Sequence, residues 1–148
     1  MSMELFSLRG KNAVVTGASR GIGQALALGL AEAGADIALI ARGQAGLEET
    51  AAMVRQAGTS VATFPCDVSK AEEVSKTFAA IAKGWSSVDV LINNAGTNVR
   101  TRALEVTDEW EAILQTNLGS AFHCSCAAAR LMMEGKQGGR IINIASVA

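Results

Sequence analysis

Short apolar segments alternate with longer segments of helical periodicity along the whole chain, and this alternation is the strongest constraint on its fold. The apolar segments lie at residues 12–16, 35–41, 60–64, 88–93 and 140–146. The second and fourth are apolar at consecutive positions, as expected for strands buried on both faces of a parallel sheet. The pattern predicts an α/β fold, in which a doubly wound parallel sheet carries helices on both faces.

The intervening segments are predicted to be helices because their apolar residues recur at helical spacing. The stripes are Ile22, Leu26 and Leu30; Leu47, Ala51 and Val54; and Val74, Phe78 and Ile81. Ser69 and Glu72 have the spacing of a capping box that would open the third helix. The last helix is predicted to run from about Thr107 to Glu134. One face of it would carry Trp110, Ile113, Leu114, Leu118, Ala121 and Phe122.

Composition excludes several classes of function. Residues 1–148 have the length of one domain, with 49% hydrophobic residues and a net charge of −1, which argues against nucleic acid as a partner. No apolar run is long enough to span a bilayer, and the first residues do not resemble a secretory signal. The odd count of three cysteines favours a reduced, cytoplasmic chain. One histidine and scattered cysteines provide no ligand set for a metal.

A glycine-rich turn follows the first predicted strand and leads directly into a helix. Its sequence from Thr16 to Gly23 is TGASRGIG, with the spacing Gly-x-x-x-Gly-x-Gly. Glycines at a strand-to-helix turn let backbone N–H groups approach a pyrophosphate, and the N-terminus of the helix favours its negative charge. The turn therefore predicts nucleotide binding. A tight turn that binds no ligand is the alternative.

Five features in order resemble the classical short-chain dehydrogenase/reductase family. They are the glycine motif, Asp67-Val68 after the third strand, the run NNAG at residues 93–96, Asn117 in the long helix and Ser146 at the end of the fifth strand. The resemblance covers the whole chain and roughly the first three-fifths of a typical member. It implies a Rossmann-like fold. Gluconate 5-dehydrogenase-like and 3-oxoacyl-ACP reductase-like members are the most similar kinds.

The end of the second strand bears on the choice of cofactor. In doubly wound folds an acidic residue there binds the ribose 2′-OH of NAD. Here Ala41 takes that place, Arg42 follows, and Arg20 lies in the glycine turn. Two guanidinium groups suit a 2′-phosphate, so NADP(H) is expected rather than NAD(H). Two ordinary surface arginines are the alternative.

The resemblance implies further contacts with the cofactor. Asp67 and Val68 would contact the adenine, unless Asp67 only caps the turn before the third helix. Asn94, Ala95 and Gly96 would line the ribose, whereas Asn93 is expected to be structural. The complete set of predicted cofactor-binding residues is Gly17, Ser19, Arg20, Gly21, Ile22, Gly23, Arg42, Asp67, Val68, Asn94, Ala95 and Gly96.

The resemblance also implies two catalytic residues, Asn117 and Ser146. Asn117 would help to hold a water in a proton relay, or would simply be a satisfied buried amide. Ser146 would hydrogen-bond the substrate carbonyl. A tyrosine in a Tyr-x-x-x-Lys motif would donate the proton, yet the 148 residues contain no tyrosine. We therefore expect a chain that is truncated before the Tyr-x-x-x-Lys segment and inactive alone. Its fifth strand would then expose the apolar residues Ile141, Ile142 and Ile144 at an edge.

Three functions remain open at this stage. The first is an NADP(H)-dependent oxidoreductase that interconverts a small-molecule carbonyl and a secondary alcohol, and the resemblance implies a homodimer or homotetramer. The second is a non-catalytic dinucleotide-binding fragment or sensor, which the missing tyrosine favours. The third is an epimerase or dehydratase of the extended relatives, against which the glycine spacing and the NNAG run argue.

Overall fold

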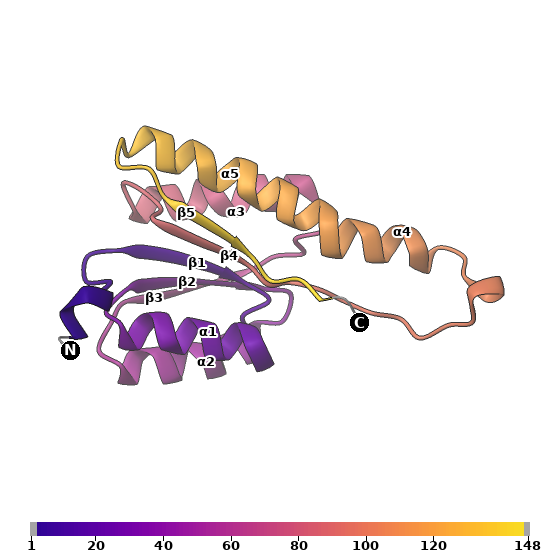
Figure 1. Ribbon diagram of the computed structural model, residues 1–148, viewed down its shortest axis with the longest axis horizontal. Coiled ribbons are helices and arrows are strands. Elements are labelled where there is room, and N and C mark those ends of the chain that lie inside the picture. Colours follow the sequence, from indigo (N-terminus) through magenta and orange to yellow (C-terminus); the bar gives the residue numbers. More distant parts are fainter. Residues whose placement is uncertain (1–2, 147–148) are drawn as a thin grey trace.

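The computed structural model describes residues 3–146 and contains one five-stranded sheet (Figure 1). All strand pairs are parallel, in the order β3-β2-β1-β4-β5. The strands are β1 (Asn12–Thr16), β2 (Asp36–Ala41), β3 (Val61–Pro65), β4 (Val90–Asn93) and β5 (Arg140–Asn143). The predicted parallel sheet and its five strands are confirmed.

Helices cover both faces of the sheet, which confirms the doubly wound, Rossmann-like arrangement. In Figure 1, α1 (Gly21–Glu32) and α2 (Gln44–Gln56) lie below the sheet, and α3 (Ala71–Gly84) and α5 (Ser120–Glu134) lie above it. A shorter helix, α4 (Glu109–Leu114), leads into α5 through a π-helical turn, η3 (Gln115–Gly119). Two 3₁₀ turns, η1 (Met3–Phe6) and η2 (Ala103–Glu105), complete the elements.

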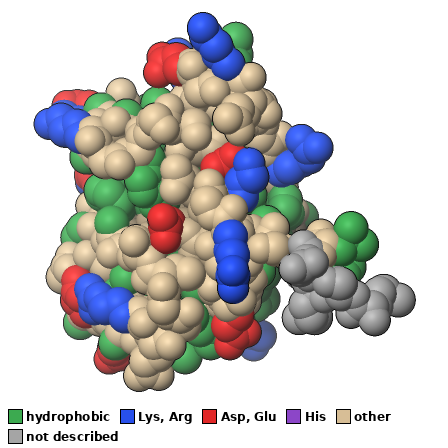
Figure 2. Space-filling view, turned by 90° about the vertical axis from the view of Figure 1, so that its left-hand side faces the viewer, with side chains coloured by type: hydrophobic (Ala, Val, Ile, Leu, Met, Phe, Trp, Pro, Cys, Tyr) green, Lys and Arg blue, Asp and Glu red, His purple; other side chains and the backbone are tan. Residues whose placement is uncertain are grey.

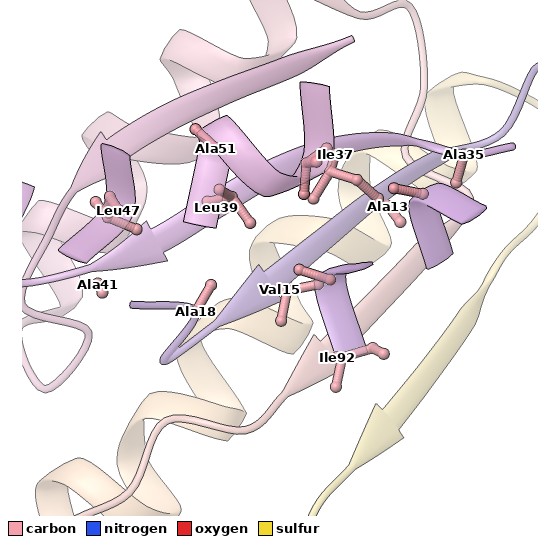
Figure 3. Packing of buried hydrophobic residues seen from close by; sticks show 13 residues of the cluster. Ala13, Val15, Ala18, Ala35, Ile37, Leu39, Ala41, Leu47, Ala51 and Ile92 are labelled. Atoms are coloured by element: carbon pink, nitrogen blue, oxygen red, sulfur yellow. The ribbon is translucent and has the colours of Figure 1, made fainter. Parts of the chain in front are cut away.

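The central strands divide their side chains between two cores. Ala13 and Val15 of β1 join Leu39 of β2 in the core between the sheet and helices α1 and α2. Val14 and Ile40 face the core between the sheet and helices α3 and α5. Figure 3 shows the first of these cores, in which Leu47 and Ala51 of α2 belong to the same cluster as Leu39. Because side chains alternate across a strand, a strand with apolar residues at every position can fill both cores.

The predicted stripe of α1 is only partly right. The buried positions of this helix are Gly23, Ala27 and Ala31. Leu26 is half-buried, and Ile22 is 65% exposed. Small side chains allow the helix axis to approach the sheet, so the larger residues move to the sides of the contact. Ile22 instead faces the cleft described below.

The predicted long helix is interrupted, and its apolar face is not the buried one. The π turn Gln115–Gly119 separates α4 from α5. The residues of α5 buried against the sheet side are Ser120, Cys124, Ala128 and Met132. Trp110, Leu118 and Phe122 are each more than 60% exposed in this chain. The extra residue in a π turn changes the phase of the helix, so a single helical wheel does not describe the whole segment.

The fifth strand is shorter than the apolar run that predicted it. β5 ends at Asn143, and the backbone N–H of Ile144 still donates to the Asn93 carbonyl oxygen at 2.9 Å. Within the described residues β5 is an edge strand, with Ile141, Ile142 and Ile144 each about 40% exposed. The predicted exposure of these isoleucines is confirmed.

Charged side chains of both signs are interspersed on the face at the amino ends of the strands (Figure 2). One ion pair in this region lies just before the starts of β1 and β4, where the Nζ atom of Lys11 is 2.9 Å from a carboxylate oxygen of Asp89. Asp89 also accepts a hydrogen bond from the backbone N–H of Asn12. Across residues 3–146, no helix is both long and apolar enough to cross a bilayer.

Leu39 offers a test of the core in Figure 3, because its side chain is completely buried between β2 and the helices. Leu39→Ala is expected to lower the free energy of unfolding by about 2–5 kcal/mol, from lost burial and the cavity left behind. Urea denaturation followed by circular dichroism measures this change. The matched control is Leu104→Ala at a fully exposed position, for which equal destabilisation would contradict the assignment of the core.

Candidate functional site

A cleft of about 690 Å³ lies at the carboxyl ends of the strands. The chain passes from β1 through β2 to β3 on one side, and β4 then lies on the other side of β1. This change of direction is the topological switch point at which open α/β sheets bind ligands. The volume falls in the range of small-molecule sites.

Most of the residues predicted to bind a cofactor line this one cleft. They are Gly17, Ser19, Arg20, Gly21, Ile22, Arg42, Asp67, Val68, Asn94, Ala95 and Gly96. Gly23 lies behind the lining, where the glycine turn packs against β4. The fold thus brings together residues up to 79 positions apart in the sequence, from Gly17 to Gly96. Their role in binding stays a prediction.

The glycine turn is shaped by two requirements that only glycine meets. Gly17 and Gly21 have φ values of 65° and 59°, in the left-handed region that disfavours other residues. At Gly23 a Cβ atom would collide with the carbonyl oxygen of Gly17 and would lie 2.5 Å from the Nδ2 atom of Asn94. The turn can therefore fold against the end of β4 only because these positions lack side chains.

The N-terminus of α1 opens toward the cleft. The residue before the helix, Arg20, makes no side-chain hydrogen bond to the first turn. The first N–H groups of a helix have no partner inside the helix, and they carry a partial positive charge. Gly21 and Ile22, at the start of α1, line the cleft. The cradle left by the missing side chains and these N–H groups fit the pyrophosphate of a dinucleotide.

A buried threonine ties the glycine turn to the strand beside it. The Thr16 hydroxyl oxygen accepts hydrogen bonds of 3.0 Å from the backbone N–H groups of Asn94 and Ala95. The hydroxyl itself donates to the Ile92 carbonyl oxygen. The Nδ2 atom of Asn94 donates back to the carbonyl oxygens of Thr16 and Gly17, at 3.1 and 3.3 Å. The ends of β1 and β4 are therefore held in a fixed relation.

Asn93 is structural, as expected, and it secures the next strand. Its Nδ2 atom donates to the Oδ1 atom of Asn143 at 2.9 Å and to the Ser125 hydroxyl at 3.0 Å. These bonds join β4 to β5 and to α5. The Oδ1 atom of Asn93 is buried without a hydrogen-bond partner among the residues that the structure describes. Such an oxygen is costly unless water reaches it.

The cleft carries opposite charges at the end of β2. Arg20 and Arg42 line it, and neither guanidinium forms an ion pair within residues 3–146. A second hollow of about 530 Å³ adjoins the cleft at Arg42 and Asp67 and continues to Asp108 and Glu111. A group bound at Arg42 would therefore meet acidic side chains as well.

Asp67 holds the turn before α3, and the predicted capping box is wrong. α3 begins at Ala71, without a side-chain cap. The Oδ1 atom of Asp67 accepts from both the hydroxyl and the N–H of Ser69, while Glu73, not Glu72, reaches back to the N–H of Asp67 at 2.8 Å. The hydrogen bond from the Ser69 hydroxyl, the largest cause, lowers the pKa of Asp67. Asp67 therefore both caps this turn and lines the cleft.

Several residues that line the cleft were not predicted by any sequence motif. Gly43, Gly46 and Glu49 come from α2 and the turn before it, Cys66 precedes Asp67, and Thr116 lies in the π turn. Burial raises the pKa of the Cys66 thiol, so the cleft floor there is neutral. Gly46 and Glu49 are three positions apart in α2. A helical wheel centred on Gly46 was the available signal for Glu49, because a glycine inside a helix often marks a close contact.

The two predicted catalytic residues, Asn117 and Ser146, are not among the residues that line the cleft. Asn117 is exposed, in the π turn, and its amide makes two hydrogen bonds with the backbone of Thr97: it accepts from the N–H at 2.7 Å and donates to the carbonyl oxygen at 2.9 Å. Its amide is satisfied, but the alternative of a buried amide is wrong, because the side chain is exposed. Ser146 is exposed and lies three residues past the end of β5. Their catalytic roles stay predictions.

No group of three or more His, Cys, Asp or Glu side chains that could hold a metal ion occurs within residues 3–146. The cleft itself offers backbone N–H groups, two guanidinium groups, two carboxylates and neutral amides. Such a set binds and orients phosphates and hydroxyls.

Comparisons with known proteins agree with this geometry. The family model of the short chain dehydrogenases matches residues 11–148. Gluconate 5-dehydrogenase of Gluconobacter oxydans is 39% identical over 97% of this chain and 56% of its own length. The 3-oxoacyl-acyl-carrier-protein reductase of Vibrio cholerae is 41% identical over 95% of this chain and 57% of its own length. A crystal structure of NAD⁺-bound xylitol dehydrogenase superposes with a TM-score of 0.90 at 36% identity, covering 95% of this chain and 55% of that one. The chain thus spans little more than half the length of these relatives.

Thr16 tests the link between the glycine turn and β4. Thr16→Val keeps the shape of the side chain but leaves the N–H groups of Asn94 and Ala95 without their acceptor. The free energy of unfolding is expected to fall by about 1–3 kcal/mol. Urea denaturation of this variant beside Thr63→Val, which loses only two exposed hydrogen bonds, measures the difference. Equal losses would show that the buried hydroxyl has no special role.

Asp67 predicts a contribution to stability that depends on pH. Its pKa in the folded chain is lowered, so its stabilising effect is present above the unfolded pKa of about 3.9 and is lost as the pH falls through the folded pKa. Ser69→Ala is expected to raise the folded pKa toward that ordinary value. A carbon-13 NMR titration of the Asp67 carboxyl group measures it, with Ser75→Ala on the exposed side of α3 as control. An unchanged pKa in Ser69→Ala would refute the assigned cause.

Proposed function

Because the chain belongs to the short-chain dehydrogenase family, with a family match over residues 11–148, we propose that it is the cofactor-binding part of an NADP(H)-dependent oxidoreductase. The proposed reaction interconverts a small-molecule carbonyl and a secondary alcohol. The observation that carries the proposal is the cleft at the end of β1, where the glycine turn meets Arg20 and Arg42, which form no ion pair within residues 3–146. The proposed cofactor site comprises the predicted residues from Gly17 to Gly96 that line this cleft.

The proposed division of labour follows the chemistry of the lining. The glycine turn and the N-terminus of α1 would bind the pyrophosphate, and Arg20 and Arg42 would bind the 2′-phosphate by charge and paired hydrogen bonds. Asp67 and Val68 would contact the adenine, and Asn94, Ala95 and Gly96 the ribose. The bound dinucleotide would supply or accept the hydride.

The reacting end of the site would involve Asn117 and Ser146. By holding both backbone groups of Thr97, Asn117 positions the segment that follows β4 and fixes the π turn beside the cleft. The resemblance assigns to Ser146 a hydrogen bond to the substrate carbonyl. The proton donor of the family is a tyrosine, and these 148 residues contain none. We therefore propose that this chain alone binds the dinucleotide without turnover, and that a Tyr-x-x-x-Lys segment outside residues 1–148 completes the site.

The remaining features of the proposal concern its setting. We propose a cytoplasmic homo-oligomer, either a dimer or a tetramer. The exposed Trp110, Leu118 and Phe122 on α4, the π turn and α5 support an apolar contact between copies. Among substrates, a sugar acid is favoured by the identity with gluconate 5-dehydrogenase and by Arg100 and Arg102 in the exposed segment after β4. The identity with the acyl-carrier-protein reductase makes a 3-oxoacyl thioester the second candidate.

A non-catalytic dinucleotide-binding module is the second candidate function, because the 148 residues lack a tyrosine. Both candidates require dinucleotide binding. The intact mass of the protein purified from its natural source separates them. A mass well above 15.3 kDa together with NADPH oxidation by that protein favours the enzyme, whereas 15.3 kDa without turnover favours the module.

Arg42 tests the proposed cofactor. Arg42→Ala is expected to weaken NADPH binding about tenfold, from the loss of a charged hydrogen bond to the 2′-phosphate, and to change NADH binding by less than about twofold. Titration of the dinucleotide fluorescence measures both dissociation constants. The control is Arg55→Ala, because Arg55 lies in the last turn of α2, pairs with Glu48 and does not line the cleft. Equal losses for NADPH and NADH would argue against a 2′-phosphate site at Arg42.

A further inference from the structure

The wall of the cleft contains a carboxylate that the glycine turn and the strand ends do not account for. Glu49, in the second turn of α2, lines the cleft together with Arg20 and Arg42. The helix is firmly docked at this point. A Cβ atom on Gly46 would lie 2.9 Å from the Cβ atom of Ser19, and the buried Thr50 hydroxyl donates to the Ala18 carbonyl oxygen at 2.8 Å. Glu49 is therefore held beside the glycine turn by its two helical neighbours.

The charge of Glu49 is not committed to another group in the chain. Its side chain makes no hydrogen bond or ion pair in the part of the chain that the structure describes, residues 3–146. The adjacent Glu48 behaves differently, because its carboxylate pairs with Arg55 at 3.6 Å and accepts hydrogen bonds from Gln44 and Thr63. Asp67, the other acid of the cleft, is engaged by Ser69. Glu49 is thus the acid of the cleft whose charge remains available to a ligand.

The charge balance of the cleft follows from this arrangement. Two guanidinium groups and two carboxylates line it, so its formal charges cancel. A dedicated site for a phosphate dianion would be expected to carry a positive excess. A 2′-phosphate near Arg20 and Arg42 would be attracted by both and repelled by Glu49 and by Asp67, whose carboxylate also interacts with Arg42. A ribose that bears hydroxyl groups has no charge to repel, and a carboxylate can accept hydrogen bonds from it.

We propose that Glu49 is a specificity-determining residue of the cofactor cleft, which weakens the binding of the 2′-phosphorylated dinucleotide and so allows the unphosphorylated one to compete. This inference rests on the proposed function, because it concerns the same cleft. It makes the cofactor preference a balance between Arg20 and Arg42 on one side and Glu49 on the other. The ratio of NADPH affinity to NADH affinity is then smaller than the two arginines alone would produce.

The test is a pair of matched variants of neighbouring residues. Glu49→Gln removes the charge in the cleft, and Glu48→Gln removes the same charge one position away, outside the cleft lining. Dissociation constants for NADPH and NADH are measured by fluorescence titration of the purified chain. Glu49→Gln is expected to tighten NADPH binding about three- to tenfold and to leave NADH within about twofold or slightly weaker. Glu48→Gln is expected to leave both constants unchanged.

Ionic strength provides a second readout that a merely structural effect would not reproduce. The gain in NADPH affinity in Glu49→Gln is expected to shrink between 0.05 and about 0.5 M salt, because repulsion between exposed charges is screened. A gain that is equal for NADPH and NADH, or that does not depend on salt, would overturn the proposal. No change in either constant would also overturn it.

Binding by the chain with its native sequence distinguishes a failure of the role of Glu49 from a failure of the proposed function. If the chain with its native sequence binds NADPH and NADH and only the Glu49→Gln effect is missing, the role of Glu49 is refuted and the proposed function stands. If the native chain binds neither dinucleotide while its circular dichroism is that of a folded α/β protein, the proposed function fails and the role of Glu49 fails with it.

Discussion

The close approach of the glycine turn to the end of β4 is the contact on which the rest of the site depends. Gly17 and Gly23 leave no room for a Cβ atom beside Asn94, and the Thr16 hydroxyl supplies the acceptor for two N–H groups of the neighbouring segment. This contact fixes where β1 ends, where α1 begins and how far apart the two walls of the cleft stand. Because the contact is made of backbone and of short polar side chains, it leaves little freedom for adjustment, so the cleft is formed before any ligand arrives.

Electrostatics divides the cleft into regions of different character. Near α1 the electrostatic field is set by backbone N–H groups. These groups do not titrate, and their positions do not change when a side chain rearranges. Near the end of β2 it is set by the long side chains of Arg20, Arg42 and Glu49, which are exposed and sensitive to salt. The proposed recognition of a pyrophosphate and the proposed discrimination at a ribose therefore rest on different physical grounds, one set by the rigid backbone and the other adjustable by single substitutions.

The strands, their parallel arrangement and most of the residues that line the cleft could be read from the sequence, because apolar runs and glycines at turns are local signals. Three features could not. The buried face of α1 uses Gly23, Ala27 and Ala31, which a search for large apolar residues overlooks. The apolar face predicted for the long helix fails at the π turn, since the inserted residue shifts the phase and leaves Trp110 and Phe122 exposed. Glu49 enters the cleft only through the docking of α2, a tertiary contact without a motif.

The interrupted helix has a mechanical consequence. α5 is seated on the sheet through four buried residues, whereas neither α4 nor the π turn contains a buried residue, and both project past the sheet in Figure 1. Because none of its residues is buried, the projecting part is not anchored by the core. Thr116 lines the cleft from the π turn, and Asn117 ties that turn to the backbone of Thr97. On that side the wall of the cleft is thus held by the hydrogen bonds of one exposed amide, whereas the opposite side, built on β1 and α1, is held by the buried core.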